Sequence, residues 1–367
     1  RTEVVKGPPA AAPPQAVEGF ARKQGLSADQ LEQKDGYWQA SRLIEGRPAT
    51  EILSEKLPQL ILGIPWPKTM LWPGKGGTRF IRPIRWLICL LGKDIVPFEI
   101  NGVKTSDFTM GHRRVGKRKP LKISISSYEK TLAKNGVILR AEERRKKIQD
   151  EVAALGGQID DALLQTHVYL NEFPHAIGGE FATEYLSLPE EVLVTVMRHH
   201  QKYFAVYGPD GLLAAQFVAV TNTPGDPDVI RAGNERVLRA RFNDARFFFD
   251  VDQKKKLEDR VEDLRQVTFH KEIGSYYEKA LRMVALCDDE SSRRAALLSK
   301  ADLTTDMVKE FTELQGVVGG RYAEVQGESE EVAKATTLNF IMAQADCCKD
   351  ANICLPLVGM HQQRLLQ

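Results

Sequence analysis

The chain has 367 residues, of which 43% are hydrophobic and 27% are charged, a composition typical of a globular protein rather than a disordered one. Its longest apolar runs, such as residues 86–91, fall far short of the roughly 18 residues that span a bilayer, so the sequence excludes a membrane protein and predicts no membrane partner. Five cysteines are too few for a disulfide framework and fit a reducing compartment. Because no charged-then-apolar leader opens the sequence, we expect a cytoplasmic protein.

The net charge of +2 hides one strongly basic stretch. Between residues 111 and 148, thirteen lysines and arginines stand against three acids, a net charge of +10. Such a stretch in an otherwise balanced chain favours a polyanionic partner, most simply nucleic acid. The alternative is a solvent-exposed helix face whose acidic partners lie elsewhere in the fold, and charge alone leaves both open.

The first half of the chain predicts an extended lead-in followed by helices. Four prolines in residues 7–14 disfavour a helix and favour an extended backbone. Apolar residues at near-helical spacing predict an amphipathic helix over 50–60, which ends before Gly63. Residues 127–156 are predicted to form helices rich in lysine and arginine.

The middle of the chain predicts a helix, a hairpin and a second, longer helix. Pro189 and the two glutamates after it favour a helix start, and that helix is expected to run to His200. Two β-rich runs, at 202–207 and 212–220, are separated by a Gly-Pro-Asp-Gly turn, which predicts a hairpin.

Residues 234–249 predict a helix with two distinct faces. At 100° per residue, four apolar side chains lie within about 60° and predict a face packed on the core. They are Leu238, Phe242, Ala245 and Phe249. Arg236, Arg239 and Arg246 lie within about 80° on the neighbouring face, a spacing that suits phosphate contacts. Ion pairing with acids of the same fold is the alternative, and the sequence does not choose between them.

After residue 265 the composition becomes helical, without clear hairpins, and we place a domain boundary there. Two long amphipathic stretches follow, at 275–300 and 303–316. The helical character predicts a second, all-helical domain.

Signatures of catalysis are absent from the sequence. It contains no serine nucleophile elbow, Cys-X-X-Cys pair, His-Glu-X-X-His or three-glycine dinucleotide motif, and the Gly-Lys-Gly-Gly at 74–77 lacks the Walker spacing and is expected to be a mobile turn. His199 and His200 are neighbours and should point apart on a helix, where two metal ligands need a spacing of four. We therefore expect no catalytic residue, no metal site and no cofactor in this chain.

Ten short motifs, in a constant order, carry a resemblance to a known family. They lie at residues 80–86, 111–113, 196–204, 233–241, 243–248, 267–269, 274–275, 300–303, 307–308 and 313–316. On these motifs the chain resembles the beta subunit of bacterial glycyl-tRNA synthetase from roughly residue 1 to 334. The resemblance implies an α2β2 glycine–tRNA ligase in which the alpha subunit activates glycine with ATP and Mg. The beta subunit then serves binding of tRNA(Gly) and assembly.

The resemblance also implies the fold, an α+β chain in three parts. Residues 1–265 are expected to be a mixed α/β domain similar to the editing-domain fold of phenylalanyl-tRNA synthetase beta chains. Residues 266–334 are expected to be an incomplete, all-helical HD-like domain, whereas residues 335–367 match nothing in the family. The family's beta chain is nearly twice as long, and the resemblance implies that its N-terminal segment and its C-terminal anticodon-binding domain lie outside this sequence.

The sequence departs from a working HD site, which needs adjacent histidine and aspartate ligands. Lys300-Ala301-Asp302 stands there instead and leaves too few ligands for a divalent pair, so this chain alone should have no catalytic activity. The alternative is a stand-alone hydrolase, either an editing-like esterase or an HD phosphohydrolase. Only His199 and His200 are candidates for its base, and neither has a carboxylate nearby in sequence.

Basic residues in the motifs and in the basic stretch are the candidates for contact with tRNA or the partner chain. They are Arg82, Arg85, His112, Arg113, Arg114, Lys117, Arg118, Lys119, Arg198, His199, His200, Lys202, Arg236, Arg239 and Arg246.

Overall fold

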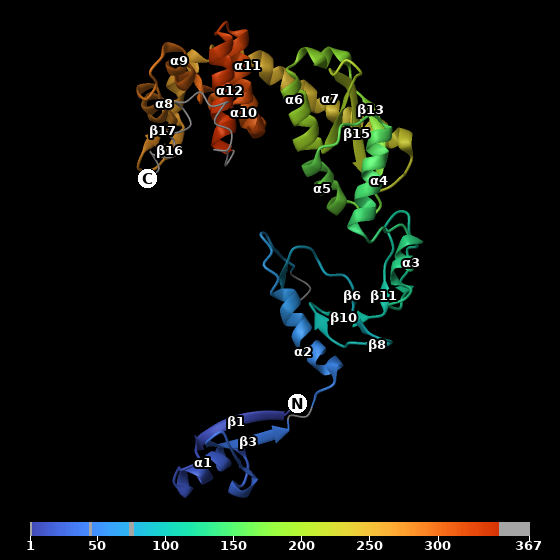
Figure 1. The fold of residues 1–367 in the computed structure, drawn as a ribbon. Coiled ribbons are helices and arrows are strands. Elements are labelled where there is room, and N and C mark those ends of the chain that lie inside the picture. The colour runs from blue at the N-terminus through green and yellow to red at the C-terminus, as the bar shows by residue number, and fades with distance from the viewer. Residues whose placement is uncertain (1, 44–45, 73–76, 345–367) are drawn as a thin grey trace. The chain divides into compact units, whose positions relative to one another are not determined.

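The computed structural model describes residues 2–43, 46–72 and 77–344 (Figure 1). Two compact units are present, one of residues 1–111 with 117–131 and one of residues 112–116 with 132–367. Helices and sheets occur together, which confirms the α+β class. The domain boundary expected after residue 265, where the composition changes, stays a prediction. In the part of the chain that the structure describes, no helix has both the length and the apolar character needed to cross a membrane.

The first unit begins with a small antiparallel sheet covered by one helix. Its strands are β1 (Thr2–Pro9), β2 (Glu32–Lys34) and β3 (Tyr37–Leu43), in the order β1-β3-β2, and its helix is α1 (Pro14–Gln24). Val17 and Ala21 of the helix pack with Leu31 and Ala40 in a minor core. The proline-rich lead-in is extended as predicted only as far as Pro9, which ends an edge strand where a missing N–H costs no ladder bond. Residues 10–12 form a turn instead, and Pro14 begins α1, because the first turn of a helix tolerates proline.

The rest of the first unit consists of one helix and short paired strands. The predicted helix forms as α2 (Ala49–Leu62) and has no buried residue. The paired strands are β4 (Met70–Leu71) with β5 (Arg79–Phe80), β7 (Leu90–Leu91) with β8 (Asp94–Ile95), and β11 (Phe108–Thr109) with β12 (Leu121–Lys122). A three-stranded sheet combines β6 (Leu87–Ile88), β10 (Val103–Ser106) and β9 (Glu99–Ile100). Residues 74–76 of the expected glycine-rich turn lie outside the described residues.

The second unit is built on an antiparallel sheet that is buried on both faces (Figure 1). It contains β13 (His175–Glu180), β14 (Tyr203–Tyr207) and β15 (Leu213–Thr221), in the order β13-β15-β14, and β14 with β15 is the predicted hairpin. Phe204 and Val206 point to one side, against α4 (Ala141–Ala154) and α5 (Asp161–Leu170). Tyr203 and Ala205 point to the other side, in the core that includes α6 (Glu190–Thr195) and α7 (Pro227–Asp252). The basic segment predicted to be helical is α3 (Tyr128–Ala133) and α4.

The residues after 265 are mostly helical, with two departures from expectation. A short hairpin of β16 (Thr268–His270) and β17 (Gly274–Ser275) comes first, and its strands are too short for apolar alternation to reveal them. Neither long amphipathic stretch is one continuous helix: two helices share 275–300, and 303–316 consists of η6 (Ala301–Thr304), α10 (Asp306–Glu310) and η7 (Thr312–Leu314). The other helices are α8 (Tyr276–Ala285), α9 (Glu290–Leu298), α11 (Val317–Val325) and α12 (Glu330–Gln344).

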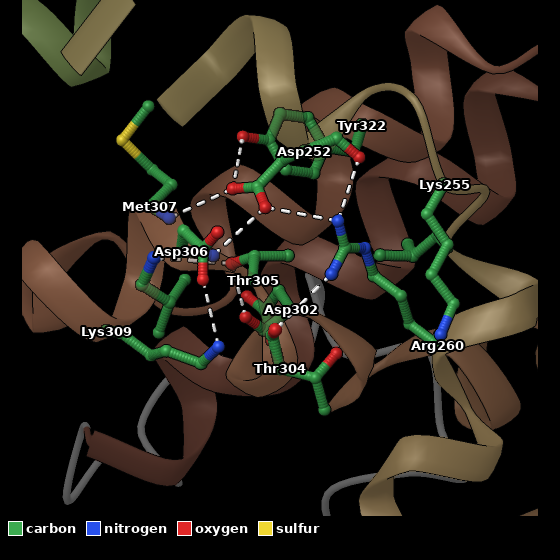
Figure 2. Close-up of polar contacts among 12 residues, drawn as sticks. Asp252, Lys255, Arg260, Asp302, Thr304, Thr305, Asp306, Met307, Lys309 and Tyr322 are labelled. Atoms are coloured by element: carbon green, nitrogen blue, oxygen red, sulfur yellow. Dashed lines mark hydrogen bonds and ion pairs between the residues drawn. The ribbon is translucent and has the colours of Figure 1, made fainter. Parts of the chain in front are cut away.

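A buried polar network fixes the C-terminal end of α7 (Figure 2). Asp252, 1% exposed, accepts a hydrogen bond from the Arg260 guanidinium at 3.1 Å and another from the Tyr322 hydroxyl at 3.2 Å. The backbone N–H groups of Asp306 and Met307 also donate to it, at 3.0 and 2.9 Å. One carboxylate therefore caps the first turn of α10 and holds the end of α7 in place.

Candidate nucleic-acid interface

The long helix α7 presents the two faces that its sequence predicts. Leu238, Phe242 and Ala245 are fully buried, and Phe249 is half-buried. The Asp226 side chain begins the helix by accepting hydrogen bonds from the first-turn N–H groups. The apolar face is thus confirmed. Part of the remaining helix surface already contacts the fold, since Arg231 donates to the Gly178 carbonyl and Arg241 pairs with Glu310.

Two buried tyrosines fix the rotation of α7. The Tyr203 hydroxyl donates to the side-chain oxygen of Asn234 at 2.7 Å, and the Tyr185 hydroxyl donates to that of Asn243 at the same distance. Burial also raises the pKa of Tyr203 to about 12, so its hydroxyl keeps its proton and stays a donor. These positions were missed from the sequence, because an asparagine on a helix gives no sign of its partner.

The three arginines predicted along one edge of α7 are not equivalent. Arg236 and Arg239 are exposed, and neither forms an ion pair with any described residue. Arg246 instead pairs with Glu184 at 3.2 Å, and its guanidinium lies 5.0 Å from the Tyr185 ring centre. The sequence allowed either phosphate binding or ion pairing for all three arginines. Among the described residues, Arg246 is ion-paired, whereas Arg236 and Arg239 are not.

A second group of candidates lies on a turn that begins at His112. This histidine is only 3% exposed, and its Nδ1 accepts hydrogen bonds from the N–H groups of Arg114 and Val115 at 3.2 and 3.1 Å. The Gly116 N–H closes the turn on the His112 carbonyl at 2.8 Å. Arg113 and Arg114 are exposed on the turn, whereas the His112 ring has almost no surface to offer a partner and serves to hold the turn.

The candidates in the first unit are surface residues. Lys117, Arg118 and Lys119 are exposed on irregular backbone before β12. Arg82 and Arg85 are exposed on either side of Pro83, between β5 and β6.

The remaining candidates lie around a π-helix, η3 (Val196–Gln201), which continues α6 where an α-helix was predicted. The two histidines do not point apart as expected, because both reach Glu313. Nδ1 of His199 lies 3.9 Å from one of its carboxylate oxygens, and Nε2 of His200 lies 3.7 Å from the other. A π-helix places successive side chains differently from an α-helix, which accounts for the difference.

Charges around the π-helix are largely balanced. Arg198 pairs with Asp160 at 2.9 Å, and Lys202 donates from Nζ to the His199 carbonyl at 2.7 Å. Burial, with help from the Arg198 charge, lowers the pKa of His199, which is therefore neutral near pH 7. The His–Glu distances exceed hydrogen-bond length, so these groups form a loose cluster rather than an oriented catalytic dyad. Sequence reasoning missed Glu313, because it lies far along the chain.

Metal-binding geometry is absent from the described residues, where no three histidine, cysteine, aspartate or glutamate side chains are grouped to hold an ion.

The model of the glycyl-tRNA synthetase beta subunit family matches residues 1–347. The chain belongs to this family. The match reaches residue 347, so the expectation that residues 335–367 match nothing in the family is wrong for residues 335–347.

Curated relatives in the family are similar over most of this chain but only part of their own. The glycine–tRNA ligase beta subunit of Acidobacterium capsulatum is 44% identical, in an alignment that covers 91% of this chain and 51% of that protein. The corresponding subunit of Phenylobacterium zucineum is 40% identical, with coverage of 93% and 54%. That of Geobacter sulfurreducens is 39% identical, with coverage of 92% and 52%. The chain thus spans about half the length of the curated relatives it matches.

Proposed function

We propose that this chain is the tRNA-binding and assembly part of a glycine–tRNA ligase beta subunit, and that it binds tRNA through phosphate contacts. The observation that carries the proposal is the outer edge of α7, where Arg236 and Arg239 are exposed and unpaired among the described residues. Their helix is held by the buried hydroxyls of Tyr185 and Tyr203, so the guanidinium groups project from a rigid support. Guanidinium groups of this kind suit bidentate contact with phosphate.

An alpha subunit is the second partner in this proposal. We infer that an α2β2 assembly forms, in the cytoplasm, and that glycine activation with ATP and Mg takes place on the alpha chain. This chain then contributes binding surface and no catalytic group, metal or cofactor. The family membership of the chain and the names of its relatives as beta subunits support this division of work.

We also propose the two domain relationships that the family resemblance implies, an editing-domain-like part up to residue 265 and an HD-like helical part after it. The surroundings of Asp302 support the absence of hydrolysis in the second part. Asp302 is fully buried and accepts the Gly316 N–H, and Lys300 is 4% exposed. A catalytic metal needs an open coordination position, which core side chains do not provide.

Salt dependence of tRNA binding tests the proposal. The 367-residue chain and its Arg236→Gln/Arg239→Gln variant are titrated with a tRNA(Gly) transcript between about 50 and 200 mM KCl. Because each lost phosphate contact reduces the slope of log K against log salt by roughly 0.7 to 0.9, the double variant should have a slope lower by about 1.5 and a weaker affinity. Its melting temperature should stay the same, because both side chains are exposed.

The matched control removes two charges elsewhere. Lys309 and Lys334 are exposed lysines paired with acids on their own helices, and Lys309→Gln/Lys334→Gln should leave the slope unchanged. If both double variants lost the same amount of slope, the effect would come from net charge alone, which would contradict a defined binding site on α7.

The hydrolase alternative would have to use His199, His200 and Glu313. Hydrolysis of aminoacyl-tRNA esters by the chain, abolished by Glu313→Gln, would favour it over the binding role. We expect no turnover above buffer with either form, measured as release of a labelled amino acid.

A further inference from the structure

A shallow groove of about 340 Å³ lies in the first unit, between the end of α2 and the segment that joins β5 to β6. Apolar and aromatic side chains form most of its lining. They are Ile61, Phe80, Pro83, Ile84, Trp86 and Leu87. Trp86 is 46% exposed, an unusual state for the largest side chain, so a flat aromatic surface faces solvent beside the groove.

Arg82 and Arg85 complete the lining, and none of the described residues that line the groove is acidic. Both guanidinium groups are exposed, and neither forms an ion pair within the part of the chain that the structure describes. An apolar groove with two free guanidinium groups is complementary to a ligand that is flat and apolar at one end and anionic at the other. A nucleotide has this character, whereas an apolar peptide segment would leave both arginines unpartnered.

The groove is held in shape by its own neighbours. Trp72 donates from its indole N–H to the Phe80 carbonyl at 3.1 Å, and the Trp66 ring packs edge-on against Phe80 with 5.6 Å between ring centres. Pro83 restricts the backbone between the two arginines. These contacts fix the Phe80 side of the groove, which lowers the entropic cost of binding on that side.

We propose that this groove binds an unpaired nucleotide of RNA, with the base against Trp86 and Phe80 and the phosphate on Arg82 and Arg85. Its volume, at the small end for ligand sites, suits one base splayed out of its strand and is too small for a duplex. Stacking on aromatic rings and arginine planes is how proteins hold unpaired bases. The inference rests on the proposed function, because it takes RNA as the partner. It adds that an unpaired nucleotide is the part of the RNA that binds in this groove.

Paired and unpaired RNA probes test the inference on the full chain. A short labelled single strand without self-complementarity is compared with the blunt duplex that it forms with its complement. Trp86→Ala should weaken binding of the single strand by about 5- to 150-fold, the equivalent of one lost stacking contact, and leave duplex binding unchanged. Trp86→Phe should keep most of the affinity. A hairpin with a closed loop and a duplex with a 3′ overhang then separate an RNA loop from an RNA end as the source of the nucleotide.

The arginines have a matched control in the same unit. Arg82→Gln/Arg85→Gln should weaken binding of the single strand, whereas Lys68→Gln/Lys93→Gln removes the same charge from exposed lysines outside the groove and should have little effect. Equal binding by wild type and Trp86→Ala, with intact melting curves, would overturn the inference. If tRNA binding kept its salt slope in that case, the proposed function would still stand, whereas a chain that binds no RNA probe would overturn both.

Discussion

The carboxylate of Asp252 receives donors from three separate segments of the chain: Arg260, the first turn of α10, and Tyr322. Asp252→Ala would strand the Arg260 guanidinium, which is 8% exposed, and leave two N–H groups unpaired. Removing one partner of a buried ion pair costs about 3–5 kcal/mol, so we expect a loss of that size in the free energy of unfolding, measured in urea. Lys309→Gln, which removes an exposed pair nearby, should cost about 0.5 kcal/mol or less. Similar losses in the two variants would contradict a central role for Asp252.

Asp302 predicts a pH dependence of stability. Burial raises the pKa of Asp302 to about 6, against opposing effects of the Gly316 N–H and Lys300, whereas its pKa in the unfolded chain is near 3.8. The folded protein holds this proton more tightly, so the stability that Asp302 contributes is present below about pH 4 and is lost as pH rises through 6. Asp302→Asn does not titrate. Its free energy of unfolding should therefore rise relative to wild type by about 2.4 kcal/mol from pH 4 to 7. Parallel curves over this range would show that the carboxyl does not titrate as described.

At the residue scale, the sequence identified which side chains are basic but not which of them are free. Arg246 and Arg239 lie on the same helix edge, yet Glu184 neutralises only Arg246. That acid lies 62 positions away in the sequence, and no local pattern links it to α7. The burial of His112 was unforeseen for a different reason: its ring accepts hydrogen bonds from the backbone of its own turn, a role that the surrounding basic residues do not indicate.

At the scale of the element, the π-helix η3 ends on Lys202 in the left-handed region, with φ +60°. This conformation costs a residue with a Cβ atom about 1–2 kcal/mol, and it costs a β-branched residue more. We therefore expect Lys202→Val to be at least about 2 kcal/mol less stable than Lys202→Gly. Both variants lose the same charge and the same hydrogen bond to His199, so the comparison in urea isolates the backbone. Equal stabilities would mean that the turn opens at little cost.

Periodicity predicted the elements whose packing is regular. The apolar stripe of α7 and the hairpin of β14 and β15 follow directly from spacings of 3.6 and 2 residues. The amphipathic pattern of 303–316 did not predict a break in the helix there. The break occurs because Thr305 follows η6 and caps α10, while Asp252 accepts hydrogen bonds from the N–H groups of the new first turn. Contacts from distant residues decide such breaks, and a local window does not contain them.

At the scale of the whole molecule, the basic stretch should act through the number of phosphates it neutralises. Arg113, Arg114, Arg118 and Lys119 are exposed, so changing all four to glutamine should leave the melting temperature within a few degrees. The salt slope of tRNA binding should fall by up to about 3. Gly116 and His112 are left untouched, which keeps the turn intact. An unchanged slope would mean that the charge concentrated between residues 111 and 148 serves something other than RNA.

The family of the chain was readable from its motifs, and the resemblance that they carry implied the α+β class. The division into two compact units was not predicted, because the sequence analysis interpreted the change in composition near residue 111 as a sign of a binding partner rather than as a boundary. Surface candidates named from the sequence, such as Arg82 and Arg236, became informative only once burial and ion pairing separated free cations from paired ones.

The anchoring of α7 also limits how this segment changes in evolution. Asn234, Asn243 and Asp252, at intervals of nine residues, each bond a different part of the fold. Inserting or deleting one residue between them would turn the rest of the helix by about 100° and misplace every later anchor. We therefore expect related sequences to vary between positions 234 and 252 by substitution alone, with the number of residues held constant, so that an alignment of the family has no gap there.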